Sequence, residues 1–163
     1  MSKPTQKMLL SIFDYDPGNG ELTRKAKLDS RGWPLSRRKA GHVRKDGYVH
    51  VQIGPASYYA HCIIWCMVSG VWPAHQIDHK NLCRSDNRLN NLRPATPSQN
   101  KANIRPLNAI KAKGIEVLPS GKFRARLRCN GRDYHLGCFT RLEDARSAYA
   151  KCASEMFGEY ARV

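Results

Sequence analysis

Apolar and polar positions alternate strictly in two stretches of the chain, and this alternation predicts strands with one buried face. In "VRKDGYVHVQIG", an Asp-Gly turn comes before Val49, Val51 and Ile53, which would share one face of a strand. In "KFRARLRC", four apolar residues alternate with three arginines. Near the N-terminus, "FDYDPGNGELT" predicts a strand, a turn and a second strand, within a region (8–41) that otherwise reads as irregular.

Two other stretches carry apolar residues at helical spacing. In "YYAHCIIWCMVSG", the spacing predicts a helix that Gly70 can close. In "TRLEDARSAYAKCASEMFG", it predicts a second helix that ends at Gly158. Thr140 is the expected N-cap of that helix, and Glu143 would complete a capping box.

These elements predict an α+β chain with two domains. "GIEVLPSGKFRARLRCNGRDYHLGCF" reads as three antiparallel strands, with Asn130-Gly131 as a strong signal for a two-residue hairpin. The sheet would pack on the helix that follows it. We expect one domain over residues 1–104, a linker over 105–113 and a second domain over 114–163.

Charge suggests the kind of partner. Lys and Arg number 28 against 13 acidic residues, which gives a formal net charge of +15 on 163 residues. Residues 1–100 carry 15 basic and 7 acidic side chains, and residues 101–163 carry 13 and 6, so both halves are basic. Such a balance favours a polyanionic partner, above all nucleic acid; a ribosome-associated or simply solvated basic protein is the alternative.

Neither a membrane span nor a disulfide framework is expected. No stretch approaches the roughly 20 apolar residues that a spanning helix needs, and the N-terminal apolar segment is too short for a signal peptide. The six cysteines include no Cys-x-x-Cys pair, so free thiols are favoured over a zinc knuckle. We therefore expect a cytoplasmic protein that does not bind membranes.

The stretch "QIDHKNLCRSDNRLNNLRPATPSQN" is polar, rich in Asn, and contains adjacent Asp78 and His79. Carboxylate and amide oxygens suit a hard divalent cation, and a neutral imidazole suits a general base near pH 7. A phosphodiester hydrolase needs both groups. Adjacent strand residues point to opposite faces, so a shared site requires a bend between Asp78 and His79.

The same stretch predicts strand, loop, strand and helix in that order. "QIDH" reads as the end of one strand and "NLRPAT" as the returning strand. Thr96 can cap the helix, with Pro97 at its first position and Gln99 completing a capping box. Asn100 would then lie one turn into the helix, within reach of the strand that carries Asp78.

At this point the stretch resembles the HNH nuclease motif, in particular the phage and intron-homing branch with its "IDH…DNR…NLR…T..QN" pattern. The resemblance implies the ββα-metal (His-Me finger) fold. It implies that Asp78 and Asn100 bind a divalent metal and that His79 is the general base. It also implies that Asn91, the middle residue of the motif, holds the loop through hydrogen bonds.

One segment departs from that pattern, and one alternative stays open. Leu82 and Cys83 stand where relatives carry a turn that contains Gly. The alternative is that the Asn and Asp residues only form turns and that His79 is structural. Three basic residues of the stretch are expected to contact phosphates, or else to be ordinary surface charge: Arg84, Arg88 and Arg93.

The arginines of "KFRARLRC" would form a row on the exposed face of a narrow sheet. Such a sheet can enter the major groove of DNA, where Arg124, Arg126 and Arg128 could contact guanine or phosphate. The alternative is an edge strand made soluble by arginine. Residues 114–162 resemble the Apetala-two/ethylene-response-factor (ERF) DNA-binding domain, although relatives often carry Trp near Val117 and at Phe123.

Together these patterns predict a metal-dependent DNA endonuclease of the phage homing type. We expect a monomer that uses Mg²⁺ or Mn²⁺ and nicks one strand of double-stranded DNA in the cytoplasm of a host cell, because one such centre holds one water and one metal ion. The alternative is a DNA-binding regulatory protein whose nuclease site is vestigial.

Overall fold

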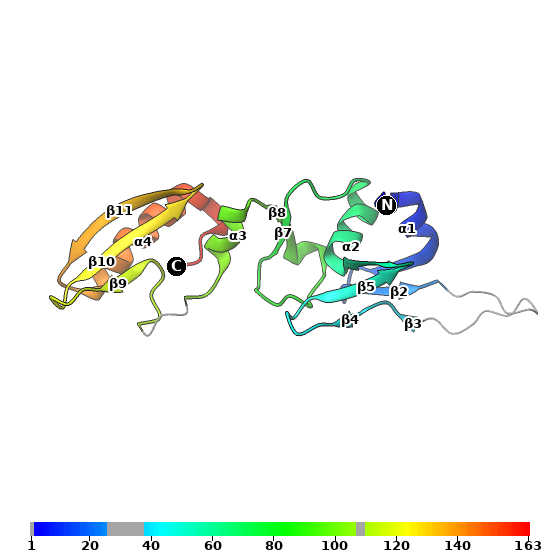
Figure 1. The fold of residues 1–163 in the computed structure, drawn as a ribbon, viewed down its shortest axis with the longest axis horizontal. Helices are drawn as coiled ribbons and strands as arrows, with labels where there is room; N and C mark the ends of the chain where they lie inside the picture. Colours follow the sequence, from blue (N-terminus) through cyan, green and yellow to red (C-terminus); the bar gives the residue numbers. More distant parts are fainter. Residues whose placement is uncertain (1, 26–37, 107–109) are drawn as a thin grey trace, which may run out of the picture. The chain divides into compact units, whose positions relative to one another are not determined.

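A computed structural model describes residues 2–25, 38–106 and 110–163. The chain forms two compact units, Met1–Pro94 and Ala95–Val163 (Figure 1). This division falls ten residues before the end of the predicted first domain, so the domain bounds remain a prediction. Parts of the region that was expected to be irregular (8–41) and of the linker (105–113) lie outside the described residues.

The first unit begins with a short helix that the sequence analysis missed. Helix α1 (Gln6–Ile12) starts at Thr5, whose side chain accepts a hydrogen bond from the backbone of Met8. We expected irregular structure there, because seven residues with one buried position give too short a pattern to detect. Strands β1 (Phe13–Asp16) and β2 (Glu21–Arg24) form the predicted hairpin.

Further strands complete two antiparallel sheets of the first unit. Strand β3 (Arg38–Lys39) joins β2 in the first sheet, whose order is β1-β2-β3. The second sheet has the order β4-β5-β6. Its strands are β4 (His42–Val43), β5 (Val49–Ile53) and β6 (Ala56–Tyr59).

Helix α2 (Ala60–Ser69) follows β6 directly and supplies much of the core of the first unit. Gly70 ends the helix in the left-handed conformation, as predicted. Apolar side chains from α1, β1, β5 and α2 meet in one core and are almost completely buried. These include Leu9, Phe13, Val51, Ile63 and Ile64.

The Asn-rich stretch folds as strand, loop, strand and helix, in the predicted order. Strand β7 (Gln76–His79) pairs with β8 (Leu92–Ala95), and the short 3-10 helix η1 (Leu89–Asn91) comes just before β8. Helix α3 (Pro97–Asn103) has Thr96 as its N-cap, and the capping box with Gln99 is present. The predicted cap is therefore confirmed.

The second unit contains the predicted three-stranded sheet and helix. Strand β10 (Phe123–Cys129) lies between β9 (Ile115–Val117) and β11 (Arg132–Phe139), and both pairings are antiparallel. Asn130 and Gly131 have φ of 49° and 81°, as a two-residue hairpin turn requires.

Helix α4 (Leu142–Phe157) covers one face of this sheet, and the short η2 (Gly158–Tyr160) follows it. Its buried positions are four residues apart: Ala145, Tyr149, Ala153 and Phe157. The predicted cap was wrong, because the helix begins one residue later than expected. Arg141, rather than Thr140, occupies the N-cap position and makes no capping hydrogen bond through its side chain.

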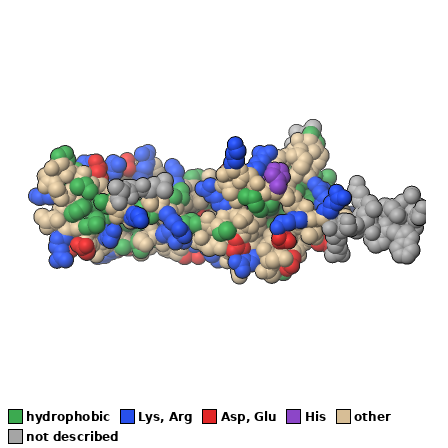
Figure 2. All heavy atoms as spheres, turned by 90° about the horizontal axis from the view of Figure 1, so that it is seen from below, with side chains coloured by type: hydrophobic (Ala, Val, Ile, Leu, Met, Phe, Trp, Pro, Cys, Tyr) green, Lys and Arg blue, Asp and Glu red, His purple; other side chains and the backbone are tan. Residues whose placement is uncertain are grey.

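Basic side chains are scattered over the visible face of both units (Figure 2). Within the described part of the chain, no helix is long and apolar enough to cross a membrane.

Candidate functional site

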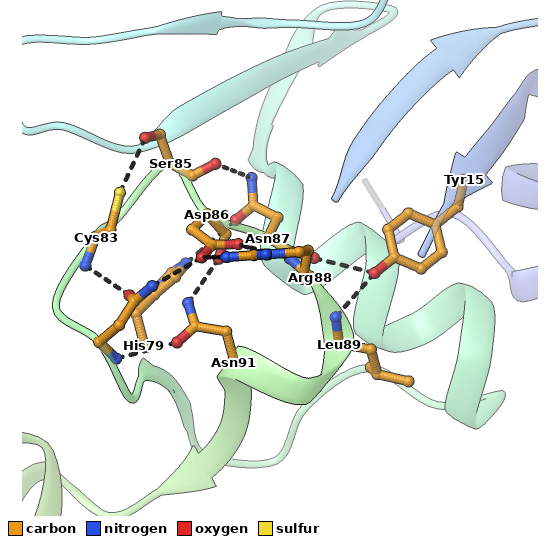
Figure 3. A network of polar contacts seen from close by, with 10 residues as sticks. Tyr15, His79, Cys83, Ser85, Asp86, Asn87, Arg88, Leu89 and Asn91 are labelled. Atoms are coloured by element: carbon orange, nitrogen blue, oxygen red, sulfur yellow. Dashed lines mark hydrogen bonds and ion pairs between the residues drawn. The ribbon is translucent and has the colours of Figure 1, made fainter. Parts of the chain in front are cut away.

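His79 is the last residue of β7, and three neighbours fix its imidazole ring. Its Nε2 lies 3.2 Å from Oδ1 of Asn87 (Figure 3). The rings of His61 and Tyr48 lie 5.0 and 5.8 Å from it, and the His61 ring is perpendicular to it. Only 4% of His79 is exposed. The ring is therefore restrained both by packing and by a hydrogen bond.

Burial keeps this group of imidazoles neutral. It lowers the pKa of His79, against the opposing effects of the Asn87 hydrogen bond and the charge of Asp78. Burial also lowers the pKa of His61 to about 3. A neutral imidazole can accept a proton, so His79 is in the protonation state that a general base requires.

Asp78 is held by a buried ion pair. Its Oδ2 accepts a hydrogen bond from Nε of Arg93 at 2.9 Å, and neither residue is more than 8% exposed. Asp78 and His79 have different partners, as expected for adjacent residues of a strand. In the structure, Arg93 binds the side chain of Asp78. Its expected contact with a phosphate stays a prediction.

Asn91 connects the two ends of the loop between β7 and β8. Its Oδ1 accepts from the backbone N–H of Asn81 at 3.0 Å, and its Nδ2 donates to the carbonyl of Asp86 at 2.8 Å. The backbone N–H of Lys80 donates to the Asn91 carbonyl at 2.9 Å. These are the contacts that a residue bracing the loop needs to make.

Asp86 is the acidic centre of the same loop (Figure 3). It accepts hydrogen bonds from Nε and Nη2 of Arg88, at 2.8 and 2.6 Å, and from Nδ2 of Asn81 at 2.7 Å. The bonds from Arg88 contribute most to lowering the pKa of the Asp86 carboxyl to about 2. Arg88, a predicted phosphate contact, is thus held against the loop itself.

Leu82 has a backbone conformation that normally belongs to glycine. Its φ is 66°, in the left-handed region, and its N–H donates to the carbonyl of His79 at 2.9 Å. The loop therefore makes a tight turn directly after His79, with Leu at the position where relatives in the resemblance carry a Gly-containing turn.

Arg84 lies near the imidazole of His79. Its guanidinium stands 5.0 Å from the centre of the Tyr48 ring and donates to the carbonyl of Asp46 at 2.7 Å. Its charge lowers the pKa of His79, which places Arg84 within electrostatic reach of the imidazole. The predicted phosphate contact of Arg84 stays a prediction.

The remaining predicted residues lie in the second unit. Asn100 is in α3, and its pairing with Asp78 stays a prediction. On β10, Arg124 donates to Glu116 at 2.6 Å and Arg128 lies 3.8 Å from Asp133. The row of arginines exists, but cross-strand acids offset part of its charge.

The sequence analysis missed three residues that surround His79. They are Asn87 in the loop, His61 in α2 and Tyr48 just before β5. A side-chain contact between distant segments leaves no periodicity in a sequence. The one available signal was that Asn87 belongs to the "DNR" part of the motif.

The stretch that carries these residues also matches known proteins. Residues 58–102 match a family model described as HNH endonuclease. That match covers 45 of the 163 residues and includes Asp78, His79, Asn91 and Asn100. An uncharacterized HNH endonuclease of Acanthamoeba polyphaga mimivirus is 28% identical over 131 residues, which cover 79% of this chain and 68% of the relative. No solved structure matches. The chain is therefore a nuclease enzyme, and its substrate is a nucleic acid.

HNH nucleases generally use a divalent metal ion. Among the described residues, no group of three or more His, Cys, Asp or Glu side chains is placed to hold one. Asp78 fits such an ion by its chemistry, because a carboxylate offers two hard oxygen donors with about four lone-pair sites. The remaining ligands would have to be amide, water or phosphate oxygens.

Proposed function

We propose that this protein is a metal-dependent DNA endonuclease that hydrolyses phosphodiester bonds at specific sites. His79 would act as the general base and take a proton from the attacking water. The observation that carries this proposal is a buried, neutral imidazole, fixed by Asn87 and adjacent to a buried carboxylate, inside the matched HNH domain. The combination supports hydrolysis better than it supports binding alone.

Asp78 and Asn100 would hold the metal ion in a ββα-metal arrangement. A bound Mg²⁺ or Mn²⁺ would supply charge stabilisation at the scissile phosphate and the leaving oxygen. Asp78 is presented at the end of β7 and is bound by Arg93, which we now assign to positioning this carboxylate. Asn91 would keep the loop closed, so that His79 and Asp78 stay together.

Arg84 and Arg88 would contact DNA phosphates, and the sheet of the second unit would bind the duplex. We propose an Apetala-two/ERF-like role for this unit because its three-stranded sheet has α4 on one face and the arginines of β10 on the other. Arg126 lies between the two arginines that have acidic partners, so Arg124, Arg126 and Arg128 would contribute unequally to DNA contact. In full, we propose a monomeric, homing-type nickase that acts in the cytoplasm of a virus-infected host cell.

Supercoiled plasmid incubated with Mg²⁺ or Mn²⁺ tests the proposal. We expect conversion to the nicked form, abolished by EDTA and by His79→Ala. Asn90→Ala is the matched control, because Asn90 is an exposed residue of the same stretch. Undiminished cleavage by His79→Ala would exclude His79 as the base.

One observation favours the alternative, a DNA-binding regulator with a vestigial site. The buried Arg93 binds the carboxylate that should hold the metal ion. In the regulator, wild-type protein would bind duplex DNA and cleave none of it with Mg²⁺, Mn²⁺, Co²⁺ or Zn²⁺. Tighter binding to structured RNA than to duplex DNA would argue against both functions.

A further inference from the structure

Asn87 joins the candidate base to a distant part of the first unit. Its side chain faces His79, and its backbone carbonyl accepts a hydrogen bond from the hydroxyl of Tyr15 at 3.1 Å. Tyr15 lies on β1, 72 residues earlier in the chain (Figure 3). Only 2% of Asn87 is exposed, so water cannot readily replace either contact.

The orientation of the Asn87 amide determines which nitrogen of His79 carries a proton. Its Nδ2 donates to the carbonyl of Ser85 at 3.4 Å, which turns Oδ1 toward the imidazole. An amide oxygen can only accept, so Nε2 of His79 must be the donor across the 3.2 Å contact. A neutral imidazole with its proton on Nε2 keeps its lone pair on Nδ1.

The hairpin of β1 and β2 holds the backbone of Asn87 in place. The Tyr15 hydroxyl accepts a hydrogen bond from the N–H of Leu89 at 2.9 Å and donates one to the carbonyl of Asn87. It therefore binds the backbone on both sides of Arg88. Gly20, in the turn of the hairpin, has a φ of 79°. A Cβ at Gly20 would meet the carbonyl carbon of Asn87 at 2.7 Å and the N of Arg88 at 2.5 Å.

We propose that Asn87 is a positioning residue that fixes His79 with its proton on Nε2, so that Nδ1 receives the proton of the attacking water. Tyr15 and Gly20 hold Asn87 at the required position. The β1–β2 hairpin is then part of the catalytic apparatus, although it carries no group that reacts. The catalytic part of this inference rests on the proposed nuclease function, and the tautomer does not.

Nitrogen-15 NMR of the imidazoles tests the tautomer without any activity measurement. The His79 signals are assigned by their loss in His79→Ala. In DNA-free wild-type protein at pH 7.5, we expect a protonated Nε2 and an unprotonated Nδ1. A proton on Nδ1 would overturn the proposal, whether or not the protein cleaves DNA. If the tautomer is as expected and cleavage is absent, the proposed function fails and the structural inference stands.

Two variants of similar shape separate the hydrogen bond from packing. Asn87→Leu removes the acceptor, and Asn87→Asp keeps an oxygen at the same place. We expect Asn87→Leu to mix the tautomers and to lower kcat about 10- to 100-fold with little change in KM. Asn87→Asp should keep the proton on Nε2. Should Asn87→Leu fail to fold, as judged by its melting curve, the wild-type tautomer and Asn87→Asp still decide the question.

Tyr15→Phe tests the contribution of the hairpin. It leaves the N–H of Leu89 and the carbonyl of Asn87 without the hydroxyl, and we expect kcat to fall severalfold with part of the tautomer preference lost. Tyr58→Phe is the matched control, because Tyr58 packs on Trp72 away from His79. Equal tautomer ratios in Tyr15→Phe and in wild type would remove the hairpin from the proposal.

Discussion

The loop between β7 and β8 and the sheet of the second unit are stabilised by different kinds of interaction. In the loop, the side chains of Asn81, Asp86 and Asn91 bind one another and the backbone. In the sheet, backbone ladders join β10 to β9 and β11, and apolar side chains of α4 cover one face. The loop therefore depends on the identity of a few polar residues, whereas the sheet depends on a repeated pattern.

The largest expected effect comes from breaking the buried ion pair of the first unit. Arg93→Leu leaves the carboxylate of Asp78 buried without its partner, and we expect a loss of about 3–5 kcal/mol in the free energy of unfolding. Urea denaturation measures this. Arg128→Leu is the comparison, because Arg128 and Asp133 are exposed and should contribute little. Equal losses in both variants would contradict the distinction between the two regions.

The sheet should instead be sensitive to deletion of apolar volume. Leu127 is 2% exposed and lies in the core between β10 and α4. Leu127→Ala should destabilise the second unit by about 2–4 kcal/mol, because it removes buried surface and leaves a cavity. Hydrogen exchange, measured residue by residue, shows which backbone amides lose protection. We expect the loss in residues 114–157, with protection of Ile63 and Ile64 retained; uniform loss would mean that the units do not unfold separately.

The loop should weaken in acid, and the direction follows from the pKa of Asp86. Hydrogen bonds lower this pKa from 3.8 to about 2. The stabilisation is complete above the unfolded-state pKa and is lost as pH falls from about 4 toward 2, with a total of up to about 2 kcal/mol. Asp86→Asn should remove this pH dependence. If melting temperatures of the variant and of wild type fell in parallel over that range, another carboxyl would be responsible.

The smallest expected effect is a gain in stability when glycine replaces Leu82 in the loop between β7 and β8. Leu82 has a left-handed backbone, which costs a residue with a Cβ about 1–2 kcal/mol, whereas glycine loses about 0.5–1 kcal/mol more chain entropy on folding. Leu82→Gly should therefore raise the free energy of unfolding by about 0.5 kcal/mol. Asn130→Gly, at φ 49° in the hairpin of the second unit, should gain less, because Asn tolerates this conformation. Thermal melts of both variants measure the difference.

Where a pattern repeats, the sequence predicted the structure well. The alternation in "KFRARLRC", the Asn130-Gly131 turn and the helix closed by Gly70 all appear as expected, because each depends on neighbours within a few residues. The capping box at Thr96 was predicted for the same reason. Helix α1 and the start of α4 were not, since a short helix and a cap without a capping side chain leave a weak local signal.

The candidate site divides in the same way. The sequence by itself determined which residues are the candidates for the chemistry: Asp78 and His79 at a strand end, with Asn91 thirteen residues after Asp78. Only the tertiary structure decided what surrounds them: Arg93 on Asp78, Asn87 on His79, and Tyr15 behind Asn87. The physical reason is that reactive groups are specified by residue type, whereas burial and hydrogen bonding between distant segments exist only once the chain has folded.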